Sequence, residues 1–304
     1  MPTSYLPPIE QTTPVLTTAQ TRIEISGRRT RTTSTRKPAR IQEAVDFWAF
    51  AGAASNVVMQ LGWPEVAYGV MESKVESGAL MSHPWKRART TAQYLAIAIL
   101  GDDAEKAAFR DAVNAAHRHV KSDEQSPVKY NAFNPELQMW VAACLFVGIE
   151  DTHQLLHGVM SPTDADEFYQ SAKTLGTTLQ VPEDMWPATR AEFDRFWNIA
   201  CQRVVIDDRT SDFLNDLVDL RMINPLIRLP FHNLLRFLTI GTLPPLFRDQ
   251  LGLEWTRKDQ RRFERLFRLV SGVNKGLPKS IRFGSSRMLV RDLRYRMKHD
   301  RAIV

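Results

Sequence analysis

Cysteine is scarce in this chain, since only Cys144 and Cys201 occur among its 304 residues. Two cysteines are too few for the disulfide framework of a small stapled domain, and their spacing does not suggest a structural zinc site. Both lie in apolar helical patterns, which predicts buried free thiols. We therefore expect a chain that relies on its core, in a reducing, cytoplasmic compartment.

Long apolar runs are also missing. No stretch approaches the roughly 20 apolar residues that span a bilayer, and the most apolar run, residues 139–149, has the length of a core helix. The first residues lack the charged start and the continuous apolar segment of a signal peptide. The sequence therefore indicates neither a transmembrane nor a secreted protein.

Signatures of strands and of several enzyme classes are absent as well. The sequence has no sustained apolar–polar alternation, no Asn-Gly hairpin turn and no repeat of fixed period. It also lacks a Gly-x-Ser-x-Gly motif, a phosphate-binding glycine loop and a dinucleotide fingerprint. Hydrolase, kinase and nicotinamide-dehydrogenase functions therefore have no support.

What the sequence does contain is helical periodicity. Apolar residues recur at spacings of three and four through residues 41–61, as in an amphipathic helix. Asp102 or Asp103 can cap a later helix, and Asn134 followed by Pro135 is a typical helix start. The predicted fold is all-α, a single multi-helix orthogonal bundle. Further helices are predicted at 64–77, 84–100, 103–121, 134–160, 163–178, 188–206, 211–220, 224–239, 256–273 and 284–299.

Charge is distributed unevenly along the chain. Residues 1–40 contain seven Lys and Arg against two Asp and Glu, residues 41–254 contain 18 against 28, and residues 255–304 contain 15 against four. We predict a disordered basic segment at 1–40, a helical domain at 41–250 and a basic helical extension at 251–304. The favoured arrangement packs the extension on the acidic body, and binding of nucleic acid or of an anionic membrane is the alternative.

A candidate site centres on His117, in the helix predicted at 103–121. Apolar neighbours at helical spacing place it on or beside the buried face. Arg87 and Thr91 are four residues apart and project from one face of the preceding helix, which a short loop makes an antiparallel neighbour. An imidazole, a cation and an apolar wall are the parts that a haem site needs. A core histidine bonded to a backbone carbonyl is the alternative interpretation.

Three segments together resemble a known family. They are RARTT at 87–91, the helix that ends in His117, and YNAFNP at 130–135 ahead of LQMWV at 137–141. Over residues 43–250 the chain is similar to the MpaB-like and latex clearing protein (rubber oxygenase) family. The resemblance implies globin-like helical packing around a haem pocket, b-type haem, and cleavage of isoprenoid carbon–carbon double bonds with dioxygen.

The resemblance also implies roles for individual residues. His117 takes the position of the axial ligand to the haem iron, and Arg87 and Thr91 take those of the paired polar residues over the haem, to which catalysis is assigned. Trp140 is the aromatic side chain expected at the cofactor. Further candidates for the pocket wall are Met139, Leu145 and Phe146.

Two positions relate to the distal side of the family's site. Thr90 stands where the rubber-cleaving members carry a distal lysine, which is a departure from their pattern. Those members also use a glutamate as a base, and either Glu72 or Glu76 corresponds to it. The sequence KSDEQSP at 121–127 replaces the family's glycine-rich turn.

The predicted function is a haem b (iron protoporphyrin IX)-dependent oxygenase that uses dioxygen on an apolar, isoprenoid or lipid, substrate. Two alternatives stay open: a non-catalytic apolar-ligand-binding protein of the same fold, and a partner-binding protein that acts through its basic C-terminus. Residues 229–246 fit a substrate mouth, a peripheral membrane contact or simple packing. Glu150, His153 and His157 share one helix side and form a second candidate metal site. No oligomeric state is indicated.

Overall fold

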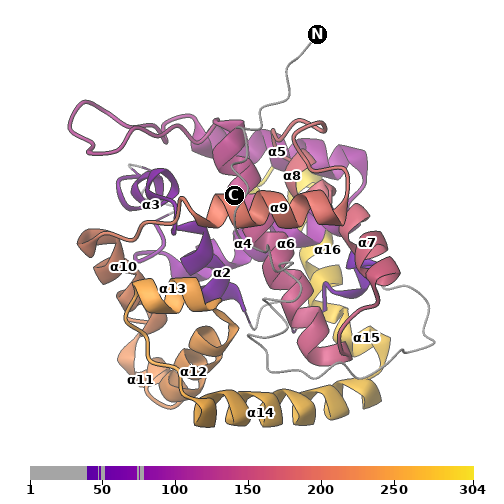
Figure 1. Ribbon diagram of the computed structural model, residues 1–304. Coiled ribbons are helices and arrows are strands. Elements are labelled where there is room, and N and C mark those ends of the chain that lie inside the picture. Colours follow the sequence, from indigo (N-terminus) through magenta and orange to yellow (C-terminus); the bar gives the residue numbers. More distant parts are fainter. Residues whose placement is uncertain (1–39, 47, 49–51, 74, 76–78) are drawn as a thin grey trace.

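Helices make up all the regular structure of the residues that the computed structural model describes, which are 40–46, 48, 52–73, 75 and 79–304. The all-α prediction is confirmed for this part of the chain (Figure 1). The disordered segment predicted at 1–40 lies outside it, apart from Arg40. An isolated antiparallel bridge joins Lys121 to Asn131 and closes a loop in the middle of the chain.

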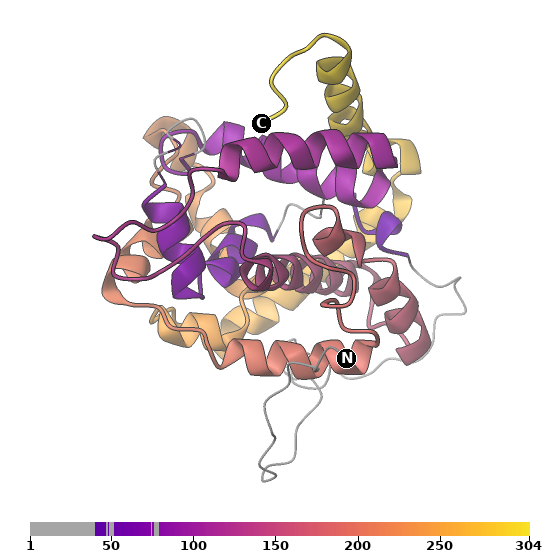
Figure 2. The ribbon, with the colours of Figure 1, turned by 90° about the horizontal axis from the view of Figure 1, so that it is seen from above.

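A long buried helix, α6 (Pro135–His157), runs through the centre of the molecule (Figures 1 and 2). Its start follows the predicted pattern: the Asn134 side chain accepts a hydrogen bond from the Glu136 N–H at 2.8 Å, and Pro135 occupies the first turn. Apolar side chains cover nearly all of its sides, so α6 forms the core. The helices that pack most extensively on it are α2 (Ala53–Gln60), α8 (Thr174–Thr177) and α14 (Arg257–Gly276).

The two helices that carry the candidate residues, α4 (Pro84–Leu100) and α5 (Asp103–His117), lie side by side (Figure 2). A capping box fixes the turn between them, because the side chains of Asp102 and Glu105 each accept a hydrogen bond from the other's backbone N–H at 2.9 Å. Helix α5 ends at His117, four residues before the predicted end. Helix α16 (Gly284–Lys298) also packs along α4.

The continuous helix predicted at 41–61 is wrong for residues 44–46. A short 3-10 turn, η1 (Ile41–Glu43), is followed by non-helical backbone, and α2 begins only at Ala53. Asp46 makes one local contact and one long-range contact in this segment. The Asp46 carboxylate accepts a hydrogen bond from the Trp48 N–H at 3.0 Å, and this local bond competes with helical hydrogen bonding. The same carboxylate pairs with Arg282 at 3.1 Å, a contact with a distant part of the chain.

Two further predicted helices divide. The helix predicted at 224–239 becomes α11 (Pro225–Arg228) and α12 (His232–Thr242), because Pro230 offers no N–H to a continuing helix. The helix predicted at 163–178 becomes α7 (Pro162–Gln170) and α8. In both cases the apolar periodicity continues across the interruption, so the pattern alone did not reveal it.

The remaining helices complete the shell around the core. They are α3 (Pro64–Met71), α9 (Arg190–Cys201), α10 (Asp208–Val218), α13 (Pro245–Gln250) and α15 (Lys279–Arg282). Both cysteines are free thiols, but only Cys144 is buried; Cys201 is half-buried, so the burial prediction is wrong for it. None of the described helices combines the length and the apolar character needed to cross a lipid bilayer.

Candidate functional site

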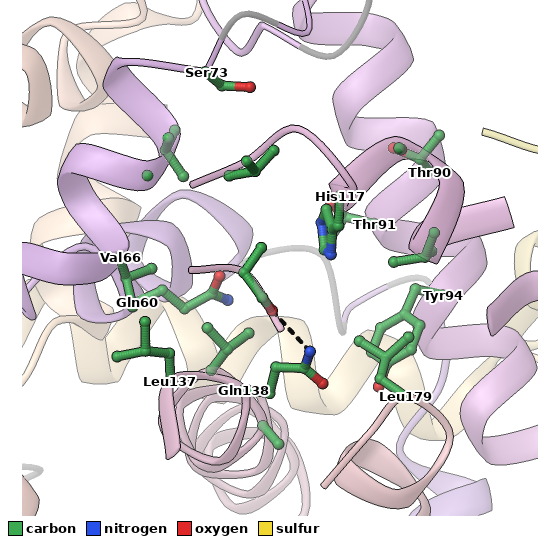
Figure 3. A pocket seen from close by; sticks show the side chains of 18 of the residues that line it. Gln60, Val66, Ser73, Thr90, Thr91, Tyr94, His117, Leu137, Gln138 and Leu179 are labelled. Atoms are coloured by element: carbon green, nitrogen blue, oxygen red, sulfur yellow. Dashed lines mark hydrogen bonds between the residues drawn. The ribbon is translucent and has the colours of Figure 1, made fainter. Parts of the chain in front are cut away.

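A mainly apolar cavity of about 280 Å³ lies between α3, α4, α5 and the first half of α6 (Figure 3). Its walls are mainly aliphatic, which excludes water and favours an apolar occupant. The valines and leucines of α3, α5 and α6 that line it are Val66, Val70, Val113, Leu137, Val141 and Leu145.

His117 presents its imidazole to this cavity from the last turn of α5 (Figure 3). Neither ring nitrogen forms a hydrogen bond with a residue that the structure describes. Burial, and next the positive charge of Arg87, lower the pKa of His117 to about 4. The ring is therefore neutral at pH 7, and a nitrogen lone pair is available to a ligand.

Arg87 and Thr91 line the same cavity from successive turns of α4. Burial lowers the pKa of the Arg87 guanidinium, and this group forms no ion pair or hydrogen bond with the residues described. An unpaired cation on an apolar wall is costly unless an anionic group of a ligand meets it. Thr90 also lines the cavity, and its hydroxyl donates to the Arg87 carbonyl at 3.0 Å.

Tyr130 also lines the cavity, and a carboxylate outside the cavity holds its hydroxyl group. The Tyr130 hydroxyl donates to Glu72 Oε2 at 3.2 Å, and Arg209 pairs with the other oxygen of Glu72 at 3.1 Å. Burial, and next the charge of Glu72, raise the pKa of Tyr130 to about 12. Glu72 therefore anchors the loop rather than lining the cavity. Glu76, the other glutamate considered, lies outside the described residues.

A chain of side-chain amides supports one wall of the cavity, and no local sequence pattern predicts it. Gln138 lines the cavity and donates to the Ala132 carbonyl at 2.8 Å and to Gln180 Oε1 at 2.6 Å (Figure 3 shows the first contact). Gln180 in turn donates to the Asn114 side chain. These contacts join residues that lie 42 and 66 positions apart in the sequence, beyond the reach of any local pattern.

Trp140 does not line the cavity. Its ring stacks between Trp63, at 4.8 Å, and Trp197, at 5.3 Å, and its Nε1–H donates to the Gln60 carbonyl at 3.0 Å. The cavity face of α6 consists of Gln138, Val141, Leu145 and neighbours at helical spacing. Trp140 falls on the opposite face. Of the further wall candidates, Leu145 lines the cavity, whereas Met139 and Phe146 are packed in the core.

The second candidate metal site is not formed. The Glu150 carboxylate pairs with Arg190 at 2.9 Å, and His157 Nε2 lies 3.4 Å from the Arg282 guanidinium. Within the described part of the chain, no three His, Cys, Asp or Glu side chains are grouped so that they could hold a metal ion. Residues 229–246 do not line the cavity either, so the substrate-mouth interpretation of that stretch has no support.

Comparison with known proteins identifies the family to which the chain is similar. The family model described as ER-bound oxygenase mpaB/B'/Rubber oxygenase, catalytic domain, matches residues 42–272. An uncharacterized protein from Mycobacterium bovis and one from Mycobacterium tuberculosis are each 43% identical over 251 residues, which cover 83% of this chain and 98% of the relative. No solved structure shows significant similarity to the chain.

Proposed function

This chain belongs to the mpaB/B' and rubber oxygenase catalytic-domain family, and we propose that it is a haem b-dependent oxygenase acting on an apolar, isoprenoid or lipid, substrate with dioxygen. The family supports an oxygenase function. The observation that carries the haem assignment is a neutral imidazole on an apolar cavity, beside a guanidinium, where neither group has a hydrogen-bond or ion-pair partner among the described residues.

The residues of the cavity fit a haem group. The porphyrin supplies four nitrogen ligands to the haem iron, so a single protein nitrogen is enough to hold it. The propionates of haem need a cation nearby, and its ring needs an apolar surface around it. His117 offers the nitrogen, Arg87 offers the cation, and the aliphatic walls offer the surface. A single histidine ligand also explains why a multi-ligand metal cluster is not required here.

Haem, when bound, would supply the activation of dioxygen. The tasks left to the chain are ligation, orientation and exclusion of water. His117 would hold the iron, and the valines and leucines of the walls would keep water from the substrate. The Thr91 hydroxyl, which has no hydrogen-bond partner among the described residues, can donate to an oxygen atom in the cavity. Thr90 offers no amine for ligation, unlike the lysine of rubber-cleaving members.

A visible absorption spectrum of the protein expressed with a haem precursor tests this proposal. We expect a Soret band in the parent and its loss or shift in His117→Ala. His119→Ala is the matched control, since His119 is exposed and lies two residues away, off the cavity. We expect that variant to keep the parental spectrum.

A colourless parent without bound iron would refute the haem assignment. If the colourless parent and the His117→Ala variant bound an apolar ligand with the same affinity, the protein would be a non-catalytic binding protein of this fold. For a coloured parent, the next measurement is dioxygen consumption with an isoprenoid alkene. We expect consumption to depend on His117 and to fall in Thr91→Val.

A further inference from the structure

An apolar patch stands out on the surface, away from the cavity. It covers α11, the segment that follows it and the first turn of α12. Exposure reaches 83% for Leu226, 67% for Leu229 and 57% for Phe231. The full patch consists of Leu226, Ile227, Leu229, Phe231, Leu234 and Leu235. Such a cluster of exposed large apolar side chains marks a contact surface rather than ordinary solvent-facing sequence.

A strongly basic face lies next to this patch. All seven Lys and Arg of α14 are exposed, whereas its two acidic residues are half-buried. Leu269 and Val273 lie on this same face, at helical spacing from Arg262 and Arg265, and are also exposed. Basic side chains interleaved with apolar ones are typical of a helix that lies in a membrane interface.

The patch and the basic face belong to one side of the molecule. Helices α12 and α14 are in contact, and the Phe237 ring of α12 lies 6.1 Å from the Phe263 ring of α14. Figure 1 shows α11, α12 and α14 together at the lower edge of the molecule. The cavity is lined by other elements, so this surface is separate from the proposed haem site.

We propose that the apolar patch and the basic face of α14 together dock the protein on an anionic lipid membrane. The apolar side chains would enter the acyl boundary, and the arginines would meet the lipid phosphates. Docking of this kind is peripheral and needs no membrane-spanning helix. It also goes beyond the proposed oxygenase function, since it requires neither haem nor substrate.

Charge and side-chain type favour a membrane over other partners. A second copy related by a two-fold axis would face the same basic surface with its own arginines, and like charges oppose that contact. Single-stranded nucleic acid would need aromatic side chains for stacking, but the patch is aliphatic except for Phe231. An anionic bilayer offers phosphates to the arginines and acyl chains to the aliphatic side chains.

Vesicle cosedimentation of the full chain tests the proposal. The probes are vesicles of phosphatidylcholine alone and of equal parts phosphatidylcholine and phosphatidylglycerol. We expect binding to the anionic vesicles that weakens with salt, and little binding to the neutral ones. The triple variant Leu226→Ser, Leu229→Ser, Phe231→Ser should bind at least about tenfold more weakly. The variant Arg261→Gln, Arg265→Gln, Arg268→Gln should lose on the order of a hundredfold.

Two control variants match these changes elsewhere on the surface. Trp85→Ser removes a side chain that is as exposed as Leu229, at 67%, but lies on α4. The variant Arg287→Gln, Arg291→Gln, Lys298→Gln removes the same number of charges from exposed positions on α16. Both should bind vesicles as the parent does, and circular dichroism of every variant should show parental helix content.

Several results would overturn the proposal. Absence of binding to anionic vesicles would do so, and so would equal losses in the control variants. Binding of an oligonucleotide that depends on the α14 arginines, without vesicle binding, would identify a nucleic-acid surface instead. A parental dimer that the serine variant converts to a monomer, again without vesicle binding, would identify an interface between two copies of the chain.

Discussion

At the scale of single residues, the charge of Arg87 affects the protonation of His117. Arg87 brings a positive charge to an apolar wall, and this charge, after burial, holds the pKa of His117 down at about 4. The imidazole therefore stays neutral, as iron ligation requires. In the protein without cofactor, however, the guanidinium has no described partner, so it is a destabilising group that a ligand with a carboxylate would stabilise.

This leads to a prediction for Arg87→Met. In the haem-free protein the substitution should raise the free energy of unfolding by about 1 kcal/mol, because it removes an uncompensated charge from an apolar site. Haem retention should weaken at the same time, because the propionate partner is lost. Urea unfolding of the haem-free protein and the haem content after gel filtration measure the two effects.

Arg89→Met is the control, since Arg89 lies two residues away and pairs with Asp292 at 3.3 Å. It should lower the free energy of unfolding. If Arg87→Met lowers it by the same amount, Arg87 has a partner in the haem-free protein, and its proposed role toward an anionic ligand is wrong.

The sequence could predict part of this site. The four-residue spacing of Arg87 and Thr91, with the short loop before α5, was enough to bring both to one cavity with His117. Trp140 could not be placed, because α6 is apolar on nearly every side and its pattern does not show which face meets the cavity. The amide chain through Gln138 and Gln180 depends on tertiary contacts and leaves no local signal.

At the scale of helices, starts were more predictable than ends. A cap and a first-turn proline act through neighbouring residues, so Asn134 and Pro135 marked the start of α6 correctly. The break at Pro230 was missed because the apolar period continues beyond it. Asp46, in the non-helical stretch at 44–46, pairs with Arg282, which lies 236 positions away, and no local rule includes such a contact.

The contact between α16 and α4 includes a polar cluster around Asp292, which gives a pH-dependent prediction. Asp292 accepts hydrogen bonds from Arg296 at 2.8 Å and from Gln93 at 3.1 Å. Burial alone would raise the pKa of Asp292, but these bonds and the charges of Arg296 and Arg89 outweigh it and hold the pKa below its usual value. The folded state therefore favours the ionised carboxylate more than the unfolded state does.

Asp292→Asn should accordingly lower the free energy of unfolding by about 1 kcal/mol at pH 7. The contribution is present above the unfolded pKa of about 4 and is lost as pH falls through the lower folded value. The difference between parent and variant should therefore shrink below about pH 4. Urea unfolding across pH measures it, with the exposed Asp166→Asn as control. A difference that does not depend on pH would mean that Asp292 acts through packing alone.

At the scale of the whole molecule, the family match and the folded body do not end at the same place. The match stops at residue 272, within α14, but α15 and α16 follow and pack on the body. Val290 and Leu293 of α16 are buried, and Gln93 of α4 finds its acceptors on α16. Helix α16 thus covers one side of α4, the helix that presents Arg87 and Thr91.

A chain truncated after Leu277 should therefore fail to fold cooperatively. Loss of α16 uncovers apolar surface worth roughly 1.5–3 kcal/mol for each buried side chain and leaves the buried Gln93 amide without its acceptors, at about 1–3 kcal/mol. Together these losses approach the total stability of many domains, which is roughly 5–15 kcal/mol. Thermal unfolding by circular dichroism, with gel filtration for aggregation, measures the outcome.

Truncation after Asp300 is the matched control, because it keeps α16 and removes only the last four residues, including Val304 at the cavity. It should unfold cooperatively. If the chain truncated after Leu277 also unfolds cooperatively, with the parental midpoint, then α4 does not depend on α16. The arrangement of Arg87, Thr91 and His117 would then be a property of the matched region alone, and the polar contact at Asp292 would contribute nothing to it.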